Sequence, residues 1–298
     1  MLRVEEFEVA IGGGIWVAIR AMMASDRSRG VLSALGLHAN EFGFLLGTSF
    51  TLQLFVLPAL RDRTAKFLAI VCLGFVSLAL LLTFSRGGYV IAMIGILAFT
   101  VVHQRKRYLI WGLVIVAVAL SLAPSAIWDR VTTGMGESQA VGSSSDALTA
   151  GRVWIWQQVT PELWKNPMFG SGVGSTAWSS AVRQGLFNYN HPHNLFLRAL
   201  LDVGIVGFLL FAVFVRFLLV NLSRVANSIE TPPIFSALTQ GARYALIGVL
   251  VAGWSNGNYI AESELSILWM AFGITLPFMR RAGITSFSPS SGKFARVS

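Results

Sequence analysis

The segment Asn190-His191-Pro192-His193-Asn194 contains two of the four histidines in the chain and stands directly before an apolar run. An imidazole has an unperturbed pKa of about 6.5 and suits proton transfer near neutral pH. Asn194 or His193 can cap the helix that follows, and free amides in its first turn would form an anion site. We therefore expect a histidine of this pair to act as a general base at the mouth of a membrane cavity.

Two other roles for the histidine pair remain open from the residues alone. The pair can serve only to cap and position the helix, or it can bind a metal ion. The remaining histidines, His38 and His103, form no HExxH motif and have no cysteine nearby, so their spacing disfavours a metal site. We expect neither a metal nor another cofactor.

Three arginines stand where the positive-inside rule predicts few. Arg86 ends an apolar run in the stretch Thr83-Phe-Ser-Arg-Gly-Gly-Tyr, Arg152 begins a tryptophan-rich stretch, and Arg198 follows the histidine pair. A planar guanidinium binds phosphate oxygens through two parallel hydrogen bonds. Together these side chains predict a clamp for a pyrophosphate headgroup on the outer face, whereas each one alone can simply snorkel or form a surface salt bridge.

The polar stretch over residues 125–194 has features of its own. Five of the nine tryptophans fall in it: Trp128, Trp154, Trp156, Trp164 and Trp178. Tryptophan favours the headgroup level of a bilayer, which predicts a loop lying against the outer membrane surface. A packed cap and a platform that stacks on sugar rings are both open. A short helix from Arg152 to about Pro161 would place Trp154 and Trp156 on different faces.

Three glycines at spacing two follow in Pro167-Met-Phe-Gly-Ser-Gly-Val-Gly-Ser175. They predict tight turns, a close backbone approach to a ligand, or an anion-binding nest. The pattern is not the GxGxxG of a strand–helix unit, so it does not indicate a nucleotide-binding fold.

The composition identifies the kind of protein that must position these side chains. Hydrophobic residues make up 54% of the 298 residues and charged residues only 12%, about half the usual share in soluble domains. The formal net charge is nevertheless +9. A soluble nucleic-acid-binding protein would not carry so much apolar sequence, and a disordered chain would carry far less. The sequence therefore predicts a polytopic membrane protein with its charges in the connectors.

Eight apolar segments approach the length that crosses a hydrocarbon core of about 30 Å. They lie at about 8–24, 42–60, 66–84, 88–103, 107–124, 195–221, 237–256 and 263–279. Backbone groups in lipid must be satisfied within each segment, so all eight are expected to be helices. The predicted fold class is an all-α polytopic membrane protein with about eight transmembrane helices and one long extracytoplasmic loop.

Basic residues gather in alternate connectors, which predicts the orientation. Fourteen of the 23 fall on one side: Arg3, Arg61, Arg63, Lys66, Arg105, Lys106, Arg107, Arg216, Arg224, Arg243, Arg280, Arg281, Lys293 and Arg296. The positive-inside rule makes this side cytoplasmic, with both termini inside and the long loop outside. The predicted parts are N-terminal transmembrane helices over 1–124, an extracytoplasmic loop over 125–194, C-terminal transmembrane helices over 195–280 and a cytoplasmic tail over 281–298.

Three stretches carry a resemblance to a known family. They are Ser85-Arg86-Gly87-Gly88, the stretch from Gly151-Arg152-Val-Trp-Ile-Trp to Asn166-Pro-Met-Phe-Gly-Ser-Gly-Val-Gly, and His191-Pro-His-Asn-Leu-Phe-Leu-Arg-Ala-Leu-Leu-Asp-Val-Gly-Ile-Val-Gly. In this order, around a long external loop, they resemble the O-antigen ligase and O-antigen/exopolysaccharide polymerase superfamily of bacterial envelope glycosyltransferases. The resemblance covers about residues 30–280.

This resemblance implies a GT-C-like fold in the bacterial inner membrane and metal-independent transfer of a glycan from an undecaprenyl-pyrophosphate carrier. The acceptor is the lipid A-core sugar for a ligase of lipopolysaccharide biosynthesis, or another lipid-linked glycan for a polymerase. By motif position, Arg86 and Arg152 match arginines implicated in binding the pyrophosphate. His193, the histidine directly before asparagine, matches the candidate base.

The neighbouring residues His191, Asn194 and Arg198 are expected to bind substrate, and the partners to be lipid-linked glycans and membrane lipids, not nucleic acid. Two other functions remain open. One is a transporter or flippase for a lipid-linked anion, which the few ionisable groups in the deep spans, mainly Arg20 and Asp202, disfavour. The other is an inactive, truncated family member, because relatives have more spans before this region.

Overall fold

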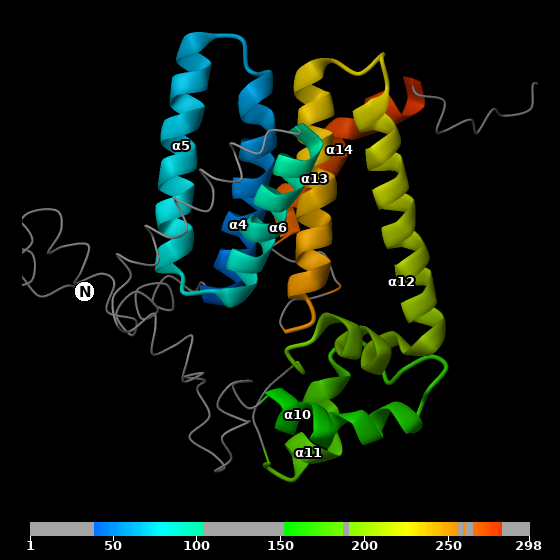
Figure 1. Cartoon of the computed structure of the whole chain (residues 1–298). Coiled ribbons are helices and arrows are strands. Elements are labelled where there is room, and N and C mark those ends of the chain that lie inside the picture. Colours follow the sequence, from blue (N-terminus) through cyan, green and yellow to red (C-terminus); the bar gives the residue numbers. More distant parts are fainter. Residues whose placement is uncertain (1–38, 104–151, 187–190, 256–258, 260–264, 282–298) are drawn as a thin grey trace, which may run out of the picture.

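Helices make up the regular structure of the described part of the chain. The structure is a computed structural model that describes residues 39–103, 152–186, 191–255, 259 and 265–281. Within these ranges the backbone forms helices and turns, with no strand. Long helices form a bundle, and a group of short helices lies at one end of it (Figure 1). The predicted all-helical fold class is confirmed.

The long helices match the apolar runs of the sequence. They are α4 (Ala39–Val56), extended by η1 (Leu57–Ala59), α5 (Arg63–Leu82), α6 (Arg86–His103), α12 (Leu195–Asn227), α13 (Pro233–Ala252) and α14 (Ser266–Arg281). Among the described residues, all of these except α14 are long and apolar enough to cross a membrane, and α14 contributes a shorter apolar stretch, Ser266–Phe278. The expected spans at 8–24 and 107–124 lie outside the described residues.

Helices α4, α6 and α13 form the centre of the bundle, where Phe44, Ile91 and Leu246 are buried together. The α4–α6 contact depends on glycines that let the two backbones approach. A Cβ atom on Gly47 would lie 2.6 Å from the carbonyl oxygen of Gly88. Small residues at such spacing are typical of tightly packed helices in membranes. This contact fixes the start of α6.

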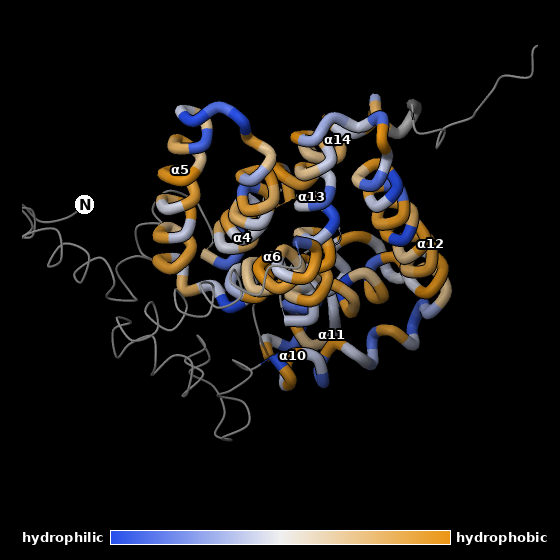
Figure 2. Tube along the Cα trace, turned by 45° about the horizontal axis from the view of Figure 1, so that its top comes forward, coloured by the Kyte–Doolittle hydropathy of each residue, from blue (hydrophilic) through white to orange (hydrophobic). Residues whose placement is uncertain are grey.

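Helices α5 and α12 present apolar outer faces. Phe75 of α5 is 69% exposed, and Leu210 of α12 is 67% exposed. Figure 2 shows both helices as mostly hydrophobic, with hydrophilic residues concentrated near the helix ends. Such surfaces suit contact with lipid chains, because apolar side chains offer no groups that need hydrogen bonds from water.

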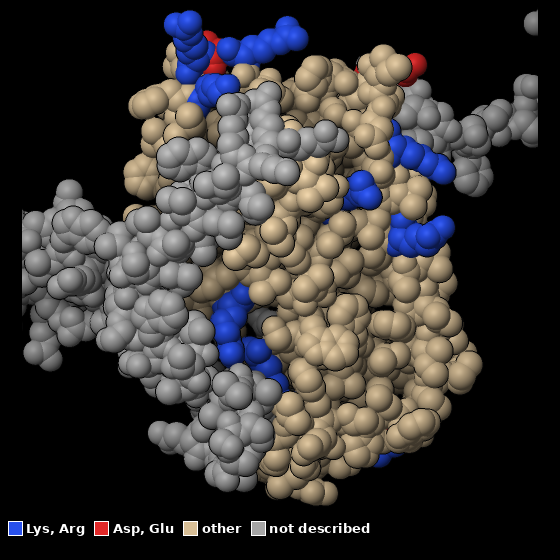
Figure 3. Space-filling model, viewed as in Figure 1, with Lys and Arg blue, Asp and Glu red and all other residues tan. Residues whose placement is uncertain are grey.

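The two ends of the bundle differ in charge. Arg61 lies in the connector between η1 and α5 and Arg63 begins α5, at the end opposite the short helices (Figures 1 and 3). Arg224 lies in the last turn of α12. Arg216 and Arg243, however, lie inside α12 and α13, each about 15 Å along the helix from the connector at 228–232. Both positions fall within the predicted spans at 195–221 and 237–256, and the structure keeps them inside helices.

The short helices belong to a segment that we call the loop module, residues 152–186. It contains α10 (Arg152–Val159), η2 (Thr160–Trp164), η3 (Ser175–Trp178) and α11 (Ser180–Arg183). Its small core joins Ile155 and Val159 of α10 to Ala181 of α11 and Leu201 of α12. Trp154 packs against this core, whereas Trp156 points elsewhere, as the helical spacing predicts.

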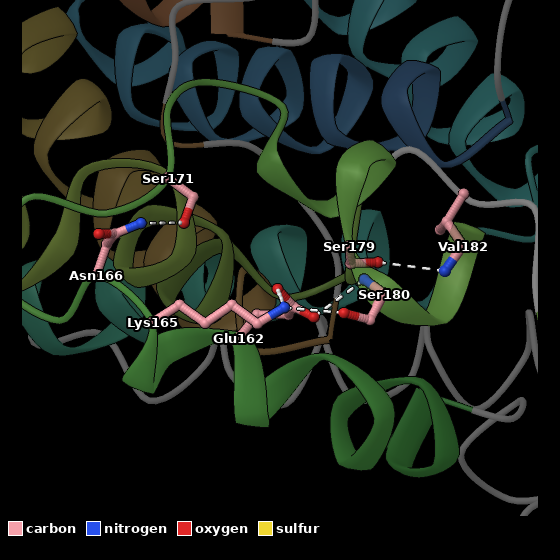
Figure 4. Close-up of polar contacts among 7 residues, drawn as sticks. All are labelled: Glu162, Lys165, Asn166, Ser171, Ser179, Ser180 and Val182. Atoms are coloured by element: carbon pink, nitrogen blue, oxygen red, sulfur yellow. Dashed lines mark hydrogen bonds and ion pairs between the residues drawn. The ribbon is translucent and has the colours of Figure 1, made fainter. Parts of the chain in front are cut away.

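Polar contacts close the loop module around Glu162 (Figure 4). Its carboxylate accepts a hydrogen bond of 3.0 Å from the Ser180 amide and lies 2.7 Å from Lys165 Nζ. Burial acts to raise the pKa of Glu162, but the hydrogen bonds from Lys165 and Ser180 outweigh it, so the pKa is lowered. The ionised carboxylate thus links η2 to α11.

Candidate functional site

Arg86 and Arg152 lie close together although a long stretch of chain separates them. Arg86 begins α6, and Arg152 begins α10. Burial, and then the positive charge of Arg86, lower the pKa of Arg152 from 12.5 to about 10. Figure 3 shows basic side chains together at the junction of the bundle and the loop module, apart from those at the other end. Two neighbouring guanidinium groups concentrate positive charge and favour an anion between them.

The backbone around Ser85 fixes the position of Arg86. Ser85 is fully buried, and its hydroxyl donates to the Asn40 carbonyl at 3.4 Å and accepts from the Gly88 amide at 3.3 Å. Gly87 packs against the Phe44 ring so closely that a Cβ atom there would overlap it. The motif Ser85-Arg86-Gly87-Gly88 thus packs its small residues against α4 and leaves Arg86 exposed at the helix start.

His193 stands in a strained turn beside His191. Its φ of 53° lies in the left-handed region, which costs a residue other than glycine about 1–2 kcal/mol. The two imidazole centroids are 4.2 Å apart, and the His193 amide donates to His191 Nδ1 at 3.4 Å. His191 Nδ1 is the acceptor in this contact, so the His191 ring packs against the backbone of the turn.

Three hydrogen bonds hold the strained turn in place. Trp156 Nε1 donates to the Pro192 carbonyl at 2.8 Å. Asn194 is the N-cap of α12, and its side-chain oxygen accepts from the Leu197 amide at 2.9 Å. The Leu195 amide donates to the Gly253 carbonyl at the end of α13, also at 2.8 Å. The predicted capping role of Asn194 is confirmed, and the turn is tied to both α10 and α13.

The same bonds reduce the anion-binding capacity of the α12 N-terminus. The amides of Leu195 and Leu197 already donate within the protein. The expectation of free amides there is therefore wrong for these two residues. Positive charge near the turn comes instead from Arg152, which stands one helical turn before Trp156 on α10.

Arg198 lies with Asp202. Its Nε is 3.7 Å from Asp202 Oδ2, one helical turn further along α12, and both side chains are largely buried. Asp202 Oδ1 also accepts hydrogen bonds from the Ser175 amide at 3.0 Å and the Ser175 hydroxyl at 2.8 Å. Tyr259 donates to Oδ2 at 3.2 Å. Burial, and then the charge and hydrogen bond of Asp202, raise the pKa of Tyr259 to about 12.

The glycine-rich stretch of the loop module docks onto a break in α12. Gly204 has φ 65° and ψ −169° inside this helix. The backbone groups that the break leaves without partners in the helix bond to the loop instead. The amides of Ser171 and Gly172 donate to the carbonyls of Leu201 and Asp202, respectively. In the other direction, the amides of Ile205 and Val206 donate to the carbonyls of Pro167 and Met168. These four bonds are 2.9–3.1 Å long. The close approach is thus to α12, and the Ser171 and Gly172 amides do not form an anion nest.

Sequence reasoning missed the roles of Trp156, Gly253 and Asp202 in this arrangement. One signal was available for Asp202, because an acidic residue in an apolar helix needs a partner. Its partner Ser175 lies in the loop module, and no local spacing connects the two. Within the described residues, no three His, Cys, Asp or Glu side chains gather as metal ligands.

Two curated relatives and one family model match this chain. A candidate polysaccharide ligase from Rickettsia felis is 24% identical over 284 residues, which cover 88% of this chain and 63% of the relative. One from Rickettsia conorii is 25% identical over 171 residues, which cover 53% of this chain and 38% of the relative. The chain therefore spans less than two thirds of the length of either relative.

A family model described as O-antigen ligase matches residues 44–212. The matched region runs from α4 to the first half of α12, so it contains both arginines, the loop module and the histidine turn. The match covers more than half of the chain, and the apolar helices within it and after it make the protein integral to a membrane. This chain belongs to the O-antigen ligase family.

Proposed function

We propose that this protein is a membrane glycosyltransferase that moves a glycan from an undecaprenyl-pyrophosphate carrier to an acceptor sugar hydroxyl, as an O-antigen ligase or a polysaccharide polymerase. The observation that carries the proposal is the pairing of Arg86 with Arg152 at one end of the bundle. Two like charges held together at the junction of bundle and loop module favour the binding of an anion between them. A lipid diphosphate supplies such an anion on a carrier that stays in the membrane.

The arginine pair acts on the leaving group. As the anomeric carbon–oxygen bond to the diphosphate breaks, negative charge builds on the departing oxygen. Guanidinium groups fixed at that position stabilise the transition state without having to reorganise. Arg152 is half-buried whereas Arg86 is exposed, so Arg152 gains the most from the incoming charge. No cytosolic nucleotide is needed, because the donor already carries its leaving group.

His193 acts on the acceptor. Its imidazole takes the proton of the acceptor hydroxyl as the oxygen attacks the anomeric carbon, so the new glycosidic bond forms as the old one breaks. The bonds from Trp156 and to Gly253 hold the turn that presents it. We place His191 and Asn194 beside the acceptor as substrate-binding and positioning residues. Arg198 completes the site from α12, oriented by Asp202.

The test replaces Arg86, Arg152 and His193 singly by alanine in cells that lack their own copy. We expect each variant to insert into the membrane at normal levels and to lose surface glycan, with the lipid-linked donor accumulating. The matched control is Arg183→Ala, an exposed arginine in the last turn of α11, which should leave the glycan unchanged. Normal glycan display by all three variants would contradict the proposal.

A reconstituted assay separates enzyme from transporter. Purified protein mixed in detergent with lipid-linked glycan and acceptor should form a new glycosidic product, and detergent removes any barrier across which transport occurs. Movement of lipid-linked glycan across vesicles without any product would favour a flippase instead.

A further inference from the structure

A shallow groove runs along one face of the loop module. Its lining residues are Val153, Trp156, Gln157, Thr160, Pro161 and Trp164. Their positions repeat at three and four residues, so they share one face of α10 and its continuation η2. The other face of α10 carries Ile155 and Val159, which are buried in the module core. The groove face therefore is not needed for folding of the module.

Trp164 lies at one end of the groove, and Trp156 lies toward the other end, next to Val153. Trp164 is 79% exposed, although its ring is large and apolar. Trp156 is partly buried and donates its Nε1 hydrogen to the Pro192 carbonyl, directly before His193. The groove thus leads from an open aromatic ring to the turn that presents the candidate base.

The chemistry of the lining favours a neutral ligand with both apolar and polar faces. None of the six lining residues is charged, whereas the arginine pair gathers positive charge at the start of the same helix. An indole face packs well against a flat apolar surface. The amide of Gln157, which is exposed, offers a donor and an acceptor to hydroxyl groups. A sugar ring has both features, with C–H bonds on its faces and hydroxyls at its rim.

We propose that this groove binds the acceptor glycan, with a sugar ring stacked on Trp164 and the chain directed along α10 toward His193. The inference rests on the proposed function and adds a binding site to it. Charge separates the two substrates: the diphosphate of the donor lies with Arg86 and Arg152, and the uncharged sugars of the acceptor lie on the tryptophan face. Both sites meet at α10.

Bilayer headgroups are the rival occupant of an exposed tryptophan. The loop module has another such residue outside the groove, Trp178, which is 72% exposed. It is the matched control, because a membrane-facing role would apply to both tryptophans and a glycan site only to Trp164. Both side chains are exposed, so alanine substitutions at either position leave the module core intact.

The test uses the purified full chain in detergent and, as probe, the lipid-free oligosaccharide released by mild acid from the surface glycan of the source bacterium. Saturation-transfer NMR should show binding to the unaltered protein and to Trp178→Ala. We expect Trp164→Ala to weaken binding by about tenfold, an amount that corresponds to about 1.4 kcal/mol. In the transfer assay, the KM for the acceptor should rise by a similar factor while kcat and the KM for the donor stay unchanged.

Two results would overturn the inference. One is unchanged acceptor binding and KM in Trp164→Ala, whether or not transfer occurs. The other is a result in nanodiscs that contain brominated phosphatidylcholine. If the bromines quench the part of the fluorescence that is lost in Trp164→Phe, the Trp164 ring faces the bilayer and not a glycan. Glycan binding that depends on Trp164 in a protein that forms no product would instead contradict the proposed transfer and leave the groove as a glycan site.

Discussion

Replacement of Arg152 by glutamine should abolish glycan transfer without destabilising the protein. Burial and the neighbouring charge of Arg86 both disfavour the charged form of Arg152. The lowering of its pKa from 12.5 to about 10, at 1.36 kcal/mol per unit, corresponds to about 3 kcal/mol against the charge in the folded protein. Arg152→Gln removes this penalty, and the loss of arginine stem packing offsets part of the gain.

The penalty does not vary across neutral pH. The folded-state pKa of about 10 lies below the unfolded value of 12.5, so the folded protein loses this proton first as the pH rises. The penalty is complete below about pH 10 and declines only between the two pKa values. The free energy of unfolding measured near neutral pH therefore includes the full penalty of about 3 kcal/mol.

The assay is thermal unfolding in detergent, followed by tryptophan fluorescence with and without inorganic pyrophosphate. We expect Arg152→Gln to unfold at the same temperature as the unaltered protein, or higher, when pyrophosphate is absent. Pyrophosphate should stabilise the unaltered protein and the control Arg183→Gln, but not Arg152→Gln. A loss of about 3 kcal/mol or more in Arg152→Gln would refute the reasoning, because that is the cost of breaking a buried salt bridge.

Three further predictions concern the groups that support the site. Trp156→Phe keeps an aromatic ring, although a smaller one, and removes the hydrogen bond of 2.8 Å to the histidine turn. We expect kcat to fall by about ten- to a hundredfold while stabilisation by pyrophosphate persists. Tyr259 has a pKa raised to about 12, partly by Asp202, so absorbance titration of Asp202→Asn should show this phenol ionising closer to pH 10. A Cβ atom on Gly170 would lie 2.5 Å from α12 backbone, whereas one on Gly172 would meet nothing within 4 Å. Gly170→Ala should therefore make the loop module susceptible to cleavage by trypsin. Gly172→Ala introduces only the strain of a positive φ, so it should resist trypsin nearly as well as the unaltered protein.

The sequence alone was sufficient for features that depend on neighbouring residues. Within the described residues, six of the eight predicted apolar runs form helices at the expected places, with shifts of a few residues at their ends. Asn194 caps α12 because a side-chain oxygen there reaches an amide three residues later. Trp154 and Trp156 face different ways because of the helical period.

Tertiary structure decided which of these residues meet. Arg86 and Arg152 each match a motif, but their shared site exists because α6 packs on α4 through glycines and α10 packs on α12 through its buried face. The spacing of the glycines in the loop module is compatible with tight turns, a ligand contact or an anion nest, and packing decides that this segment bonds to the broken backbone of α12. Residue type and local spacing determined the elements and the candidate chemistry. Only packing between distant segments decided which side chains contact one another, because contacts between residues far apart in the chain produce no periodic pattern in the sequence.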